Sequence, residues 1–167
     1  MNADQLRAVQ APLKQRYRDE PASARIPARA EAVLDADDIA CTIAGRTGPV
    51  VAGLHPAAGG NGALACSADM LLEALVACAG VTLRAVATAM GVTIRTGRII
   101  AEGVWDARGT LGIDRGVPVG LSEISLRFAI DSDADAAKLE RMIQTTERYC
   151  VILQTLRTPP SVTVTPA

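Results

Sequence analysis

A long, almost uninterrupted apolar run, SADMLLEALVACAGVTLRAVATAMG from Ser67 to Gly91, most constrains how this chain folds. Ser67 is a good helix N-cap, Asp69 places a carboxylate in the first turn, and Gly91 ends the run as a C-cap does. The pattern therefore predicts one long helix. Because Asp69, Glu73 and Arg84 interrupt it, its strictly apolar part is too short for a bilayer, and we interpret it as the buried helix of a soluble protein with no membrane partner.

Cys78 lies in the middle of this predicted helix. At about 100° per residue, a stripe of small and apolar residues falls within about 60° of it. The stripe consists of Leu71, Ala74, Leu75, Thr82 and Ala85. The charged residues of the helix lie on the other side, so a cation that lowers the pKa of this thiol has to come from another element. Free cysteine is among the most buried residue types, and on composition alone an inert core thiol is the simpler interpretation.

Short β-prone pieces precede and follow the long helix. In residues 28–53, AEAVL and IACTIAG flank the polar turn DADD, which predicts a hairpin, and PVVAG predicts a third strand. TIRTGRIIAEGVWDA and LSEISLRFAI predict two more strands, with a loop over residues 108–120. In the second of these strands, apolar and polar residues alternate as in a half-buried sheet. The apolar positions are Ile124, Leu126, Phe128 and Ile130.

The C-terminal part of the chain predicts one more helix and one more strand. We expect Ser132 to cap a helix whose apolar stripe reaches Cys150, through Leu139, Ile143 and Thr146. SVTVT, near the end of the chain, is bounded by prolines and predicts a strand at a sheet edge. Strands that cluster in runs, without strict alternation with helices, favour an α+β fold.

The N-terminal residues form a separate segment. Leu6, Val9, Leu13 and Tyr17 recur at helical spacing, which predicts an amphipathic helix, broken or kinked at Pro12. DEPASARIP then predicts a linker. We expect two parts, a helix and linker over residues 1–27 and a single domain over residues 28–167.

Composition and charge exclude several function classes. A net charge of −1 and a pI near 5.8 give no electrostatic case for binding nucleic acid. The first twenty residues hold no apolar core of signal-peptide length, which indicates the cytoplasm, where cysteines are thiols. The four cysteines form no CxxC pair and the single histidine, His55, is far from them in sequence. We expect neither a metal site nor a cofactor, and disulfide exchange of the CxxC type is disfavoured.

Cys150 offers a second interpretation of Cys78. It follows TTERY, at a point where another helix can begin, and a helix N-terminus favours a thiolate. A thiol that reduces peroxides needs thiolate character, and a nearby second thiol can resolve its sulfenic acid as a disulfide. The residues alone leave the inert thiol and the redox pair both open.

Two motifs together resemble the OsmC/Ohr family, the osmotically induced and organic hydroperoxide resistance proteins of bacteria. They are LLEALVACAGVTLRAVA and ERYCVILQTL, in which Cys78 and Cys150 lie 72 positions apart (150 − 78). The order of hairpin strands, Gly-rich loop, cysteine helix, strand pair, second-cysteine helix and closing strand also matches, and the resemblance covers about residues 28–165. It implies an α+β fold in which strands wrap around long central helices and two chains intertwine as a homodimer.

The resemblance also implies an activity, a thiol peroxidase that reduces organic hydroperoxides, with hydrogen peroxide as a further candidate substrate. Cys78 aligns with the peroxidatic cysteine and Cys150 with the resolving cysteine, whose disulfide an external dithiol reduces. We expect the substrate pocket to be lined by Leu71, Leu75 and Thr82. The alternative, from another class, is a non-catalytic protein of the same fold that binds a small apolar ligand at the dimer interface.

Three positions depart from the family pattern. Ala68 stands where a glutamate precedes the reactive cysteine by ten residues, and the DADD turn lacks the arginine that activates the thiol. Val151 follows Cys150, where the family usually has proline. Arg148, beside Cys150, is the candidate for the activating cation, and Cys66, at the start of the long helix, is a candidate third redox thiol, with packing as the simpler role.

Overall fold

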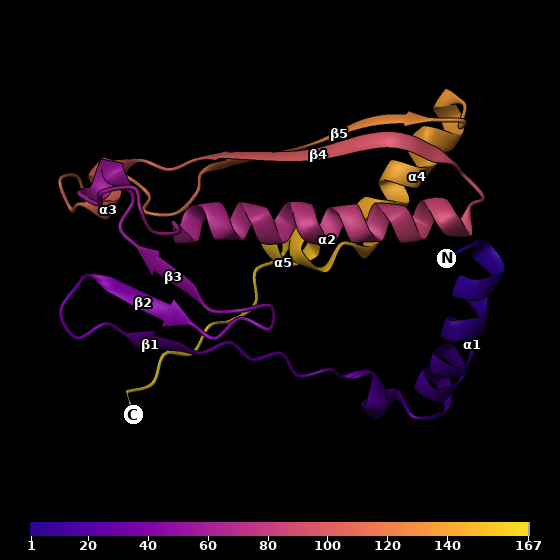
Figure 1. Cartoon of the computed structure of the whole chain (residues 1–167), viewed down its shortest axis with the longest axis horizontal. Coiled ribbons are helices and arrows are strands. Elements are labelled where there is room, and N and C mark those ends of the chain that lie inside the picture. Colours follow the sequence, from indigo (N-terminus) through magenta and orange to yellow (C-terminus); the bar gives the residue numbers. More distant parts are fainter. Residues whose placement is uncertain (167) are drawn as a thin grey trace. The chain divides into compact units, whose positions relative to one another are not determined.

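The computed structural model describes residues 1–166, with mixed helices and strands (Figure 1). They form two compact units. The first comprises Met1–Asp19, Ala74–Ile100 and the described residues from Leu126 onward, and the second comprises Glu20–Glu73 and Ala101–Ser125. Helix α2 (Ser67–Ala89) and strands β4 (Ile94–Val104) and β5 (Glu123–Ser132) each contribute to both. The boundary predicted at residue 27 stays a prediction.

The second unit contains a three-stranded antiparallel sheet in the order β1-β2-β3. Its strands are β1 (Ala32–Leu34), β2 (Ala40–Ile43) and β3 (Val50–Gly53). The Asp35 carboxylate stabilises the β1–β2 turn, because it accepts hydrogen bonds from the N–H groups of Asp37 and Asp38 at 2.9 Å. The predicted hairpin and third strand are thus confirmed. Three short helical turns also belong to the unit: η1 (Pro21–Ala24), η2 (Pro56–Ala58) and α3 (Ala107–Thr110). Helix α3 overlaps the start of the predicted loop.

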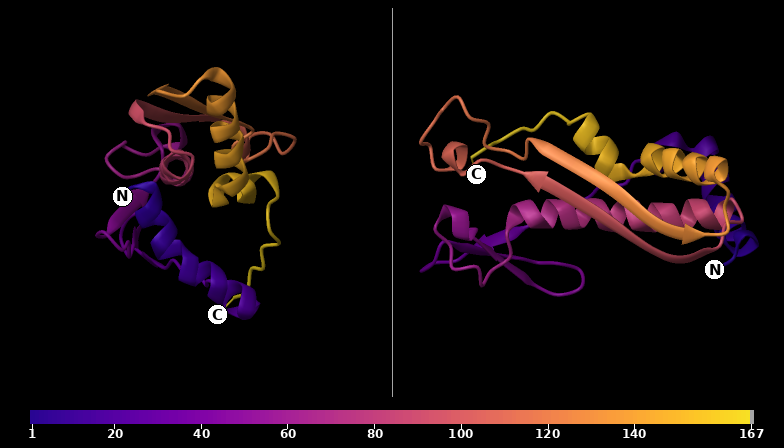
Figure 2. Two further views of the ribbon diagram at one scale, coloured as in Figure 1. Left: turned by 90° about the vertical axis from the view of Figure 1, so that its right-hand side faces the viewer. Right: turned by 90° about the horizontal axis from the view of Figure 1, so that it is seen from above.

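The first unit is built around the second half of α2. The core consists of Leu83 and Ala87 from α2, Val92 and, from α4 (Ala136–Tyr149), Met142. Strands β4 and β5 run side by side as a two-stranded sheet (Figure 2). The predicted alternation in β5 is confirmed at Leu126, Phe128 and Ile130, which are half-buried between exposed residues, whereas Ile124 is exposed.

The two ends of α2 follow the predicted boundaries to within one residue. Gly91 has a φ of 61°, and the N–H of Val92 donates to the Ala87 carbonyl at 2.9 Å, so the predicted C-cap is confirmed as a Schellman motif. At the other end, the Cys66 carbonyl accepts from the N–H of Met70 at 3.0 Å. The N-cap is therefore Cys66, and Ser67 is the first helical residue, which corrects the prediction.

Two further helix predictions need correction. Asp135, and not Ser132, caps α4, because its carboxylate accepts from the N–H of Lys138 at 2.7 Å while Ser132 still belongs to β5. Helix α1 (Ala3–Asp19) continues through Pro12. The proline removes one backbone hydrogen bond, but the turn it affects is exposed around Ala8, so water can satisfy the carbonyl that is left without a donor.

The predicted C-terminal strand is wrong. After α5 (Val151–Arg157), the described residues 159–166 contain no helix or strand. Val162 and Val164 are 83% and 88% exposed. The alternating Val–Thr pattern suits a strand, but a strand exists only where its backbone groups pair with another.

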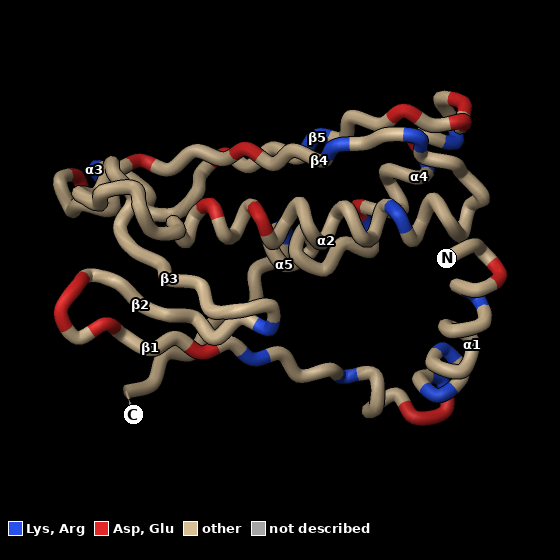
Figure 3. The backbone as a smooth tube through the Cα atoms, viewed as in Figure 1, with Lys and Arg blue, Asp and Glu red and all other residues tan. Residues whose placement is uncertain are grey.

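Helix α2 leaves much of its apolar surface uncovered in a single chain. Asp69 and Glu73 lie near its start and Arg84 near its end, with uncharged residues between (Figure 3). By length and composition alone it could cross a membrane, with a mean hydropathy of 1.8, but core helices pass the same test. Only 22% of the most apolar stretch of the helix is buried, and Val81 is 73% exposed.

Gly91→Ala should destabilise the fold by about 1–2 kcal/mol, because an L side chain is strained at a left-handed φ. Thermal or denaturant unfolding measures the difference. Gly120→Ala is the matched control, since Gly120 does not have a positive φ and a Cβ there meets nothing within 4 Å. Equal unfolding free energies for both variants would contradict the role given to Gly91.

Candidate functional site

A sharp corner between α4 and α5 positions Cys150. The N–H of Cys150 donates to the Thr146 carbonyl at 2.9 Å, and the Cys150 carbonyl accepts from the N–H of Gln154 at 3.0 Å. Cys150 is therefore both the C-cap of α4 and the N-cap of α5, with an extended backbone at φ −73° and ψ 106°. Its side chain is fully buried.

Contacts between the two short helices hold this corner. The Gln154 side-chain amide donates to the Glu147 carbonyl at 2.7 Å, and the Glu147 carboxylate accepts from Arg157 at 2.8 Å. Both bonds join the last turn of α4 to α5 in a place where the backbone has changed direction. They keep the N–H groups at the start of α5 aimed in one direction.

Those N–H groups point at Cys78. The sulfur of Cys78, on α2, is hydrogen-bonded by the backbone of Ile152 and Val151 and by the thiol of Cys150, and Thr82, one turn along α2, adds a further hydrogen bond. The two cysteines predicted as a pair are thus in contact, although 72 positions (150 − 78) separate them in sequence. Both are free thiols.

The surroundings separate the pKa values of the two thiols. Burial disfavours the Cys78 thiolate, but the hydrogen bonds from Ile152, Cys150, Val151 and Thr82 outweigh it, so the pKa of Cys78 lies below its ordinary value. For Cys150, burial and the neighbouring Cys78 raise the pKa, although the N–H groups of Leu153 and Ile152 act in the opposite direction. Of the two thiols, Cys78 is therefore the one that loses its proton first.

Arg148 occupies a different environment from the one its predicted role requires. Its guanidinium lies over the ring of the exposed Tyr149, 5.6 Å from the centroid. The hydrogen bonds at Cys78 lower the pKa without a contribution from it. Its role as the activating cation stays a prediction.

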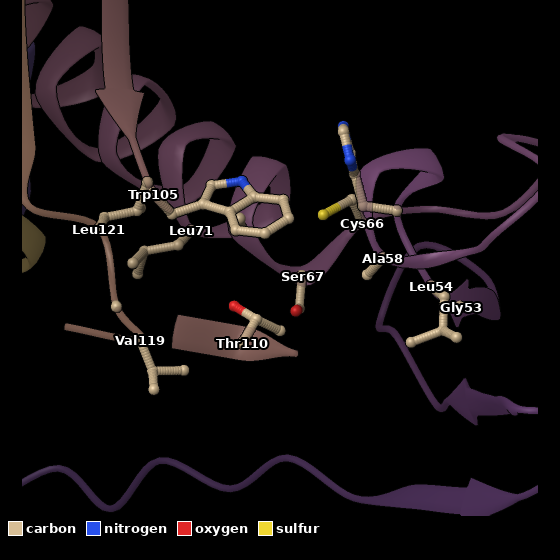
Figure 4. A pocket seen from close by; sticks show the side chains of 13 residues that line it. Gly53, Leu54, Ala58, Cys66, Ser67, Leu71, Trp105, Thr110, Val119 and Leu121 are labelled. Carbon is tan, nitrogen blue, oxygen red and sulfur yellow. The ribbon is translucent and has the colours of Figure 1, made fainter. Parts of the chain in front are cut away.

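The three residues predicted to line the pocket lie in three different settings. Thr82 contacts the Cys78 sulfur, and Leu75 is fully buried in the core. Leu71, 38% exposed, lines a cavity of about 390 Å³ in the second unit together with Trp105 and Cys66 (Figure 4). Cys41, in contrast, lies half-buried in β2.

Sequence reasoning missed the backbone donors of Val151 and Ile152. Only the replacement of the family's proline by Val151 signals one of them, because proline has no N–H to donate. No group of three or more His, Cys, Asp or Glu side chains among residues 1–166 is arranged to hold a metal ion.

Several solved structures have the same fold. An OsmC-like protein from Mycoplasma pneumoniae is 22% identical, with a TM-score of 0.67, and the match covers 80% of this chain and 89% of that one. The organic hydroperoxide resistance protein OhrB of Bacillus subtilis is 17% identical over 80% and 93% of the two chains, with a TM-score of 0.54. An organic hydroperoxide resistance protein from Legionella pneumophila is 13% identical, with a TM-score of 0.56, and the match covers 81% of this chain and 92% of that one.

The α+β fold predicted from the sequence is thereby confirmed. No curated protein matches the chain. The family described as OsmC-like protein matches residues 60–165, which include both cysteine motifs and most of the second half of the fold. The chain belongs to the OsmC-like protein family.

Proposed function

We propose that this protein is a thiol-dependent peroxidase that reduces organic hydroperoxides, with Cys78 as the peroxidatic and Cys150 as the resolving cysteine. The observation that carries the proposal is the contact between the two thiols at a place where the pKa of Cys78 is lowered. Membership of the OsmC-like family supports a role in peroxide stress, and two of the similar structures are of organic hydroperoxide resistance proteins.

In the first step the Cys78 thiolate attacks the terminal oxygen of the hydroperoxide. An S–O bond forms as the O–O bond breaks, the sulfur loses two electrons, and the departing alkoxide takes a proton from solvent to become the alcohol. The N–H groups of Val151 and Ile152 favour the anionic form of the sulfur before attack. The Cys150 thiol, which donates to the same sulfur, is already placed for the next step.

In the second step Cys150 attacks the sulfenic sulfur of Cys78. The S–S bond forms, the S–O bond breaks, and the hydroxyl leaves as water with the proton of Cys150. A raised pKa keeps Cys150 protonated until the sulfenic acid has formed, so it does not compete for the peroxide. An external dithiol then reduces the disulfide by exchange, a step that suits a reducing cytoplasm.

Backbone N–H groups lower the pKa of Cys78, as a neighbouring cation does for many reactive cysteines. Hydrogen bonds from N–H groups stabilise a thiolate as a neighbouring positive charge does, because both favour the anionic form. The proposal therefore requires neither a metal, a cofactor nor a nearby arginine at Cys78.

The proposal includes a homodimer, in which α2 packs against a second chain. Much of α2 is apolar and uncovered in one chain, with Val81 73% exposed near its middle. Burying this surface against another copy removes it from water, and obligate dimers commonly bury more than about 2,000 Å² in total.

Cys78→Ser should abolish hydroperoxide turnover, because a serine hydroxyl has no accessible anion near neutral pH and forms no sulfenic acid. Cys150→Ser should still undergo the first oxidation and accumulate a sulfenic acid, which a sulfenate-selective reagent traps for mass spectrometry. Cys41→Ser and Cys66→Ser are the controls and should keep turnover. Full turnover by Cys78→Ser with any dithiol would remove the proposed mechanism.

Val151→Pro should slow alkylation of Cys78 by iodoacetamide at mildly acidic pH by about tenfold, as expected for one lost charge-assisted hydrogen bond. The pKa of Cys78 rises because proline lacks the N–H. Proline fits the first position of a helix, and the extended backbone of Cys150 tolerates a following proline. Val151→Ala keeps the N–H and should react as the wild type. The pH profile of the alkylation rate decides, and identical profiles for both variants would count against the backbone donor.

The wild-type protein should sediment as a dimer at micromolar concentration, and Val81→Glu should shift it toward monomer, because a carboxylate buried in an apolar interface is strongly disfavoured. Val9→Glu, the same change on the exposed surface of α1, should leave the dimer intact. A wild-type monomer, or a dimer unaffected by Val81→Glu, would exclude this packing of α2.

A further inference from the structure

Neither cysteine of the proposed active site lines the cavity in the second unit. It has a volume of about 390 Å³, within the range of small-molecule sites. Its walls come from the start of α2, the segment after β3, the segment after β4 with α3, and the loop before β5. Among the thirteen described residues that line it, none is Asp, Glu, Lys or Arg.

One wall of the cavity is aromatic and apolar. Trp105 is the chain's only tryptophan, and its indole lies in the cavity with Leu71, Val119 and Leu121 around it (Figure 4). The ring of His55 contacts the indole edge-on, with ring centroids 5.3 Å apart and an interplanar angle of 86°. This contact holds the indole in one orientation and leaves it available to a planar ligand.

The polar side chains of the cavity carry hydroxyl, thiol and imidazole groups. Ser67 and Thr110 direct their hydroxyl oxygens into its centre, and the Cys66 sulfur points toward the indole (Figure 4). Nδ1 of His55 accepts from the N–H of Ala57 at 3.0 Å, so in the neutral ring the proton is on Nε2. No Lys or Arg lines the cavity, so an anionic ligand would lose its hydration without a lysine or arginine to pair with, whereas a neutral oxygen can bond to either hydroxyl.

We propose that this cavity binds a small neutral aromatic molecule that carries one uncharged oxygen, such as a ketone or a hydroxyl group. The aromatic ring stacks on Trp105 and packs against Leu71, and the oxygen bonds to the hydroxyl groups of Ser67 and Thr110. Binding at this site needs no chemistry at Cys78, so it is independent of the peroxidase reaction.

The fluorescence of Trp105 tests the proposal directly, because no other tryptophan contributes to the signal. Titration with 2-acetylnaphthalene should change it saturably, with a dissociation constant on the order of tens of micromolar. The carboxylate of the same ring, 2-naphthoate, should bind at least tenfold more weakly. A fluorescence change that does not saturate, or equal affinity for the two probes, would overturn the proposal.

Three variants and a second readout locate the binding. Ala58→Leu places a larger side chain in the cavity and should weaken binding at least tenfold, whereas Ala8→Leu, on exposed α1, should not. Cys78→Ser should bind the ketone as the wild type does, even if peroxidase activity is never detected. In the wild type, the ketone should protect Cys66 from N-ethylmaleimide, measured by mass spectrometry, so a folding defect in Ala58→Leu leaves the test intact. Unprotected Cys66 at saturating ketone would refute this location.

Discussion

The hydrogen bonds that converge on the Cys78 sulfur depend on the corner between α4 and α5. Cys150 ends one helix and begins the next, and its neighbours along the chain, Val151 and Ile152, donate to a sulfur on a different helix. Glu147 holds the corner through its contacts with Gln154 and Arg157. If the corner opened, Cys78 would lose its backbone donors and its partner thiol together.

The departure from the usual Cys-Pro pattern therefore has a physical meaning. A proline after Cys150 would start α5 equally well but would remove one of the N–H groups that face Cys78. Val151 supplies that donor in a chain whose first hairpin offers no arginine. Stabilising a thiolate with backbone donors has a further consequence, because the donors cannot move away or change their charge with pH as a side chain can.

Helix α2 serves both units of the fold with different residues. Its N-cap Cys66 and its first turns, with Ser67 and Leu71, line the cavity around Trp105. Its later turns carry Cys78 and Thr82 and contribute Leu83 and Ala87 to the core of the first unit. One helix thus contributes both to a thiol of lowered pKa and to a separate cavity.

The sequence by itself determined the long helix, the hairpin with its third strand and the half-buried alternation of β5, because periodicity and capping residues act locally. The family resemblance also predicted that Cys78 and Cys150 lie close together, as they do. Only the tertiary structure decided which groups lower the pKa of Cys78, because nearly every residue has a backbone N–H and the sequence does not show which of them face a given sulfur. It also decided which residues meet in the cavity around Trp105. It also left SVTVT without a strand, because pairing depends on a partner and not on propensity.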